Sequence, residues 1–178
     1  IYVPFQVNFD SQILLNSPWV TSMEALYCLL DKLTLHPSLS EYYFVIKEHP
    51  SDSRKYDELY DSNSRILFRN FSSQELTSKS SGVMTINSTV GLEALILDKK
   101  VIVLGNACFA IEDMVLHARN YDELEQAVLA LKMWTPDSNL RVNFLSYLKE
   151  EYCIPDSWRS PSDHHFTTLA KKLTTFSE

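Results

Sequence analysis

The segment from Thr85 to Leu95 has the residue types of an anion-binding site. It reads Thr-Ile-Asn-Ser-Thr-Val-Gly-Leu-Glu-Ala-Leu, so that Asn87 and Ser88 stand between a strand-like apolar run and a helix-like run. At such a junction, free backbone N–H groups and the helix dipole attract phosphates and carboxylates. The hydroxyls of Ser88 and Thr89 would add donors. A plain N-cap followed by a packed helix explains the same pattern.

Two residues of the same predicted helix extend this interpretation. Gly91 costs about 1 kcal/mol in a helix relative to Ala, and its missing side chain would let a phosphate or a neighbouring backbone approach closely. Glu93 comes four residues after Thr89, so both lie on one side of the helix. A carboxylate one turn beyond a phosphate site is well placed to accept hydrogen bonds from ribose hydroxyls.

The tetrapeptide Lys47-Glu48-His49-Pro50 is a second candidate site. A buried-type strand ends there in a cation, an anion and an imidazole, and the proline fixes the turn. His49 would be able to donate to a phosphate or to the edge of a base. A solvated surface histidine is the alternative. No cysteine or second histidine stands at metal-ligand spacing from His49, and the sequence predicts no metal site.

A third polar segment runs from Gln6 to Gln12, and Asp10 is its only carboxylate. Its polar residues alternate after a strand that should be central in the sheet. A hydrophilic loop between strand and helix is the alternative interpretation.

The apolar pattern of the sequence predicts the fold that would position these three segments. Short apolar runs alternate with amphipathic stretches, which predicts βαβ units and a parallel sheet with helices on both faces. Each polar segment follows a predicted strand, and open α/β sheets bind ligands outside the carboxyl ends of their strands. Strands are expected at 1–6, 42–47, 65–68, 82–86 and 100–104, and helices at 17–35, 54–60, 72–79, 89–97, 121–133, 140–151 and 161–175.

Length and composition limit the remaining possibilities. The 178 residues suit one domain over 1–178, and the net charge of −7 argues against broad nucleic-acid binding. The longest apolar runs are too short to cross a bilayer. The three widely spaced cysteines, Cys28, Cys108 and Cys153, are expected to be buried and reduced, which favours the cytosol. A chain that starts in mid-strand at Ile1 is expected to be a piece of a longer protein.

The three segments, taken in order, resemble the capsule polysaccharide biosynthesis and export family, which includes the Kdo transferases of capsule assembly. The resemblance rests on the opening Val-Pro-Phe-Gln-Val-Asn-Phe-Asp-Ser-Gln-Ile, the Lys-Glu-His-Pro turn, the Asn-Ser-Thr-Val-Gly-Leu-Glu-Ala run and the Lys-Lys-Val-Ile-Val-Leu-Gly that follows. It covers roughly Ile1 to Phe109. It implies one half of a GT-B architecture, in which two Rossmann-like domains flank a cleft.

The resemblance also implies roles for residues. This chain would be the C-terminal half that binds the nucleotide of a CMP-activated, Kdo-like sugar, without a metal or other cofactor. Gln6 would face the cleft, and Asp10 is the local candidate for the general base. The residues implied to contact the donor nucleotide are Lys47, His49, Pro50, Asn87, Ser88, Thr89, Gly91 and Glu93.

The implied partners are the sugar donor, a glycan or glycolipid acceptor and an N-terminal GT-B domain, without which the piece should be inactive. The implied location is the cytoplasm, with peripheral attachment to the inner membrane as an option. An apolar stripe near the end of the chain is expected to pack against a partner, and a second copy of the chain is one candidate. The stripe consists of Phe166, Leu169, Leu173 and Phe176. Three alternatives stay open: a glycerophosphotransferase, a UDP-sugar enzyme such as an epimerase, and a non-catalytic domain with a degenerate nucleotide pocket.

Overall fold

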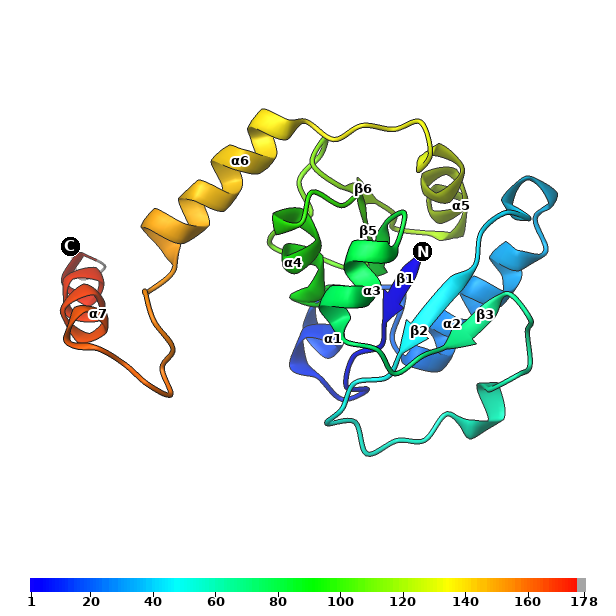
Figure 1. Cartoon of the computed structure of the whole chain (residues 1–178), viewed down its shortest axis with the longest axis horizontal. Coiled ribbons are helices and arrows are strands. Elements are labelled where there is room, and N and C mark those ends of the chain that lie inside the picture. The colour runs from blue at the N-terminus through cyan, green and yellow to red at the C-terminus, as the bar shows by residue number, and fades with distance from the viewer. Residues whose placement is uncertain (176–178) are drawn as a thin grey trace. The chain divides into compact units, whose positions relative to one another are not determined.

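The computed structural model describes residues 1–175 and contains a fully parallel six-stranded sheet (Figure 1). The order in space is β3-β2-β1-β4-β5-β6, so the direction of winding reverses between β1 and β4. The predicted Rossmann-like α/β fold is therefore confirmed. The strands are β1 (Tyr2–Pro4), β2 (Phe44–Lys47), β3 (Ile66–Phe68), β4 (Val83–Thr85), β5 (Val101–Val103) and β6 (Leu116–His117).

Helices cover both faces of this sheet. The helices α2 (Met23–Thr34) and α5 (Tyr121–Ala130) share one face, where Nζ of Lys32 lies 3.5 Å from the ring centroid of Tyr121. The other face carries α3 (Ser73–Lys79) and α4 (Val90–Ile96), which lie in front of the sheet in Figure 1. Further elements are α1 (Ser11–Asn16), α6 (Ser138–Tyr147), α7 (Asp163–Thr175), the 3₁₀ turns Pro37–Leu39 and Asp57–Leu59, and a π-helical turn at Leu148–Tyr152.

The sequence of α2 shows why these elements form where they do. Ser22 caps the helix, because its side chain accepts a hydrogen bond from the backbone N–H of Ala25. The apolar residues recur at helical spacing and are buried against the sheet: Met23, Leu26, Tyr27, Leu30 and Leu33. Each large apolar side chain that is fully buried in this way contributes about 1.5–3 kcal/mol.

Besides the 3₁₀ turn Pro37–Leu39, two elements were not predicted. The helix α1 occupies part of the expected polar loop and begins after Asp10, whose Oδ1 accepts from the N–H of Gln12 at 2.9 Å. The strand β6 has only two residues, Leu116 and His117, and exists through its pairing with β5.

The chain divides into two compact units, Ile1–Asp137 and Ser138–Glu178. The sheet belongs to the first unit. The second contains α6 and α7 and contributes no strand to the sheet among its described residues, because its sequence lacks strand-like runs.

Exposure in several places differs from expectation. All three cysteines are free and exposed, so their predicted burial was wrong. In the expected apolar stripe, Phe166 and Leu173 are exposed and Leu169 is half-buried, while Phe176 lies outside the described residues.

Within residues 1–175, no helix is both long enough and apolar enough to cross a membrane.

Candidate functional site

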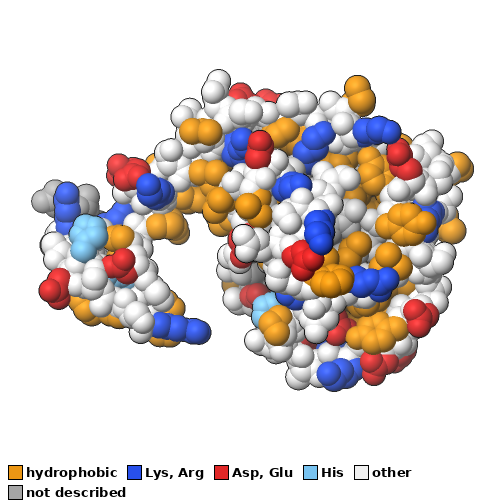
Figure 2. Space-filling view, in the orientation of Figure 1, with side chains coloured by type: hydrophobic (Ala, Val, Ile, Leu, Met, Phe, Trp, Pro, Cys, Tyr) orange, Lys and Arg blue, Asp and Glu red, His pale blue; other side chains and the backbone are white. Residues whose placement is uncertain are grey.

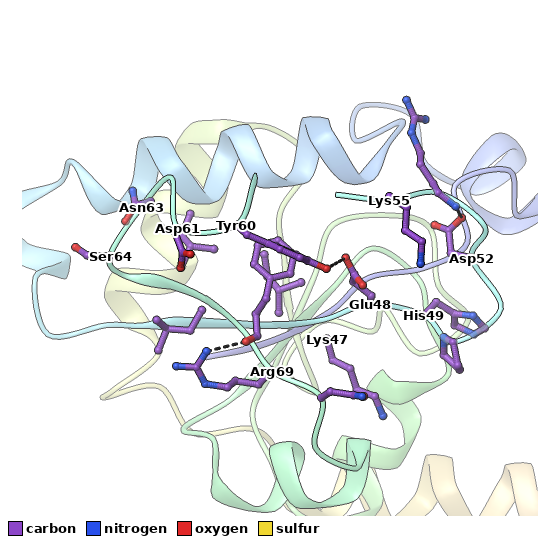
Figure 3. Close-up of a pocket in the computed structure, with 17 residues that line it drawn as sticks. Lys47, Glu48, His49, Asp52, Lys55, Tyr60, Asp61, Asn63, Ser64 and Arg69 are labelled. Carbon is purple, nitrogen blue, oxygen red and sulfur yellow. Dashed lines mark hydrogen bonds between the residues drawn. The ribbon is translucent and has the colours of Figure 1, made fainter. Parts of the chain in front are cut away.

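An open pocket of about 900 Å³ lies beside β2 and β3, bounded by the loop that joins these strands (Figure 3). Lys47, His49 and Pro50 line it, so one of the predicted polar segments faces a real cavity. Figure 2 shows acidic and basic side chains intermixed over the face of the molecule that it displays.

The turn at His49 fixes the orientation of its imidazole. The carbonyl of His49 accepts from the N–H of Asp52 at 3.0 Å, and its Nδ1 accepts from the N–H of Ser51 at 3.2 Å. A ring nitrogen that accepts must carry a lone pair, so in the neutral ring the proton is on Nε2. Because His49 is exposed, this Nε2–H is available to a ligand.

Two acidic residues of the pocket, Glu48 and Asp52, are held by tyrosines. The hydroxyl of Tyr60 donates to Oε1 of Glu48 at 2.7 Å, and that of Tyr56 donates to Oδ2 of Asp52 at 2.8 Å. The bond to Glu48 is the main cause that raises the pKa of Tyr60 to about 12, with burial second. Burial, and then the bond to Asp52, raise the pKa of Tyr56. Both phenols therefore stay protonated and keep donating to these carboxylates at neutral pH.

Among the basic residues of the pocket, Arg54 pairs with a carboxylate, since its Nε lies 2.8 Å from Oε1 of Glu24. Neither Lys47 nor Lys55 pairs with a carboxylate within residues 1–175. The Nη1 of Arg69 donates to the carbonyl of Phe68 at 2.7 Å, and the side chain is exposed. Tyr60, Lys55 and Arg69 were not among the predicted site residues. The polarity of the 48–65 loop was visible in the sequence, but nothing there indicated which of its residues line a cavity.

The segment after β4 differs from this pocket, because its polar groups bind one another. The N–H of Asn87 donates to Oε1 of Gln6 at 3.1 Å, and Nε2 of Gln6 donates to Oδ1 of Asn87 at 2.9 Å. Nδ2 of Asn87 also donates to the carbonyl of Gln12 at 2.8 Å. Gln6 and Asn87 are 5% and 8% exposed. Gln6 was expected to face a cleft, but its amide is instead buried between β1 and β4.

Two N–H groups at the start of α4 are also occupied. The N–H of Ser88 donates to Oγ1 of Thr85, and that of Val90 donates to Oγ of Ser88, both at 3.2 Å. The prediction of free backbone donors at Asn87 and Ser88 was therefore wrong. The side chains of Thr89 and Glu93 are exposed.

Gly91 has a packing role. A Cβ placed on it would lie 2.5 Å from Cζ of Phe109 and 3.2 Å from Cγ2 of Thr85. The space next to Gly91 is therefore filled by an aromatic ring of the protein, and the expected approach of a phosphate is not possible there.

The structure thus separates the predicted nucleotide site into two parts. No residue from 85 to 95, all of which the structure describes, lines the pocket at His49. Strand β1 lies between β2 and β4, which puts the two segments about 10 Å apart along the sheet edge. Asp10 lies on the loop after β1, between them, and one of its oxygens caps α1.

Comparisons with known proteins give one coherent result. Residues 1–147 match the family model described as capsule polysaccharide biosynthesis protein. Protein FixF of Sinorhizobium fredii is 40% identical over 174 residues, which cover 97% of this chain and 42% of FixF. The capsule polysaccharide export protein KpsS of Escherichia coli is 31% identical over 120 residues, covering 61% of this chain and 29% of KpsS.

A solved structure agrees with these matches. The β-Kdo 2,7-transferase structure of KpsC from Thermosulfurimonas dismutans superposes with a TM-score of 0.53 and 26% identity, covering 75% of this chain and 44% of that one. The chain therefore spans less than half the length of each of these proteins.

Proposed function

The chain belongs to the capsule polysaccharide biosynthesis family, and from this premise we propose that it is the donor-binding part of a glycosyltransferase. The proposed donor is a CMP-activated, Kdo-like sugar, and the proposed acceptor is a glycan or glycolipid. The likeness to the KpsC β-Kdo 2,7-transferase supports this assignment. Because the chain spans less than half of its relatives, we expect it to bind nucleotide but to transfer sugar only together with a complementary domain.

The observation that carries the proposal is the pocket beside the His49–Pro50 turn, at the edge of the sheet where α/β folds bind ligands. Departure of CMP leaves negative charge on its phosphate. An Nε2–H held in place before the reaction would stabilise that charge without reorganising. Lys47 lines the same pocket and adds a positive charge.

The segment after β4 has a smaller part in the proposal. The hydroxyls of Ser88 and Thr89 would each supply at most one further donor, and Glu93 is the proposed ribose ligand. Asp10 remains the proposed general base, since one of its two carboxylate oxygens is not used in capping α1.

Titration calorimetry with CMP and UDP tests this function. We expect CMP to bind more tightly than UDP. A preference for UDP would instead support a UDP-sugar enzyme, and binding of glycerol phosphate in place of CMP would support a glycerophosphotransferase. If none of CMP, CDP and UDP bound at millimolar concentration, the chain would be a non-catalytic domain.

A further inference from the structure

A chain of hydrogen-bonded side chains joins β2, α3 and β1 on the face of the sheet that α3 and α4 cover. Nζ of Lys47 donates to Oγ of Ser73 at 3.3 Å, and the hydroxyl of Tyr2 donates to the same oxygen, also at 3.3 Å. Tyr2 belongs to the central strand and is 1% exposed, so its hydroxyl is a fixed point. Ser73, which is half-buried, therefore connects Lys47 to the core of the sheet.

The ammonium of Lys47 has N–H donors beyond the one that binds Ser73. It carries three N–H bonds, of which Ser73 accepts one. No carboxylate within residues 1–175 pairs with it, although it lines the pocket beside the His49–Pro50 turn. A cation held at one point, without a counter-ion, on the wall of a pocket is suited to bind an oxyanion.

Glu93 belongs to α4, which covers the same face of the sheet. Its carboxylate adds to the effect of burial in raising the pKa of the Tyr2 phenol. Because the N–H groups of Asn87, Ser88 and Val90 are occupied, Lys47 is the stronger oxyanion donor on this face.

We propose that Lys47 is the oxyanion ligand of the pocket and that Ser73 is a positioning residue that holds the Lys47 ammonium toward the ligand. This inference rests on the proposed function and names residues within its site. The oxyanion is the phosphate of the nucleotide or the carboxylate of an acidic sugar, since both offer the same charged oxygens. Ser73 acts through Lys47, because its own oxygen already accepts two hydrogen bonds.

Titrations of the 178-residue chain with CMP and with cytidine, which lacks the phosphate, test the inference. In Lys47→Ala we expect CMP affinity to fall about ten- to hundredfold, and in Ser73→Ala about two- to tenfold, with cytidine affinity unchanged. Tyr2→Phe, which keeps the ring, serves as a milder second variant. Ser72→Ala is the matched control, because it removes the cap of α3 at Glu75 and leaves the Lys47 network in place.

The outcomes separate the inference from the function on which it rests. If the wild type bound CMP, and Lys47→Ala changed neither the CMP-to-cytidine ratio nor the affinity for free Kdo, the oxyanion role alone would be overturned. An unchanged ratio in Ser73→Ala, or an equal fall in Ser72→Ala, would overturn the positioning role. Titration with free Kdo identifies the source, since a loss there but not with CMP assigns the site to the sugar carboxylate.

If the wild-type chain bound no CMP, the proposed function would be wrong. Inorganic phosphate then decides the inference by itself. Phosphate binding that is lost in Lys47→Ala retains the oxyanion site, and absence of phosphate binding removes it as well.

Discussion

The segments after β2 and after β4 leave the same edge of one sheet and have similar polar composition, yet they use their polar groups in opposite ways. At the end of β4 and after it, the side chains of Thr85, Asn87 and Ser88 bind backbone groups, and that of Asn87 also binds Gln6. After β2, His49 and Lys47 keep donors directed at a pocket. A polar loop at the carboxyl edge of a strand is therefore a binding site only when its donors remain unused by the protein itself.

The largest expected effect is on stability, from a substitution in the segment after β4. Asn87→Ala should lower the free energy of unfolding by about 2–4 kcal/mol, because it leaves the buried Nε2 of Gln6 and the carbonyl of Gln12 without their partner. Urea denaturation measures this change. Asn106→Ala, at an exposed asparagine of a nearby loop, is the control and should change stability by under about 0.5 kcal/mol. Equal stability of the two variants would contradict the contrast between the segments.

A substitution in the segment after β2 should change ligand affinity and leave stability unchanged. His49→Ala removes a donor to a charged phosphate and should weaken CMP binding about ten- to hundredfold. His36→Ala is a matched control, because Nδ1 of His36 accepts from the N–H of Ser38 at 3.2 Å in the same kind of turn, away from the pocket. A comparable loss of CMP affinity in both variants would show that the effect does not come from the pocket.

Gly91 sharpens the comparison, since its role is steric. Gly91→Ala brings a methyl group against the ring of Phe109, and we expect a net loss of about 1–2 kcal/mol after the gain in helix propensity. CMP affinity should stay the same. Adding Phe109→Leu, which removes the clashing Cζ, should restore part of the stability, and a further loss in that double variant would argue against this packing explanation.

The smallest effect is expected at Ser88. Its Oγ already accepts from the N–H of Val90, so Ser88→Ala should cost CMP binding at most about two- to tenfold, the value of one neutral hydrogen bond. Calorimetry beside His49→Ala gives the ratio of the two losses. A loss at Ser88 as large as that at His49 would mean that both segments bind the phosphate.

Much of the fold could be predicted because apolar periodicity is local. The five expected strands and the long helix α2 all exist, since their apolar runs are continuous or recur at helical spacing. The strand β6 was missed because two residues carry no periodicity, and its pairing with Ile102 and Val103 decides its conformation. A local signal for α1 was available in Asp10, which precedes Ser-Gln-Ile-Leu-Leu and caps the helix.

The site was less predictable because hydrogen-bond partners are not local. Nothing near Asn87 in the sequence indicates that Gln6 occupies both its backbone N–H and its side-chain carbonyl. The packing role of Gly91 was unpredictable for the same reason, because the ring that fills the space beside it belongs to Phe109 in a later loop. The His49 turn was easier to interpret, because its hydrogen bonds to Ser51 and Asp52 lie within four residues.

The place of β1 in the sheet has a consequence for the order of folding. Tyr2 pairs on one side with Val45 and on the other with Val83, so the earliest strand in the chain is completed only by a late one. Closing that larger loop costs entropy before the β1–β4 contacts repay it, and such non-local pairing slows folding. During synthesis, one edge of β1 stays unpaired until β4 has emerged from the ribosome, and the Gln6–Asn87 hydrogen bonds can form only then.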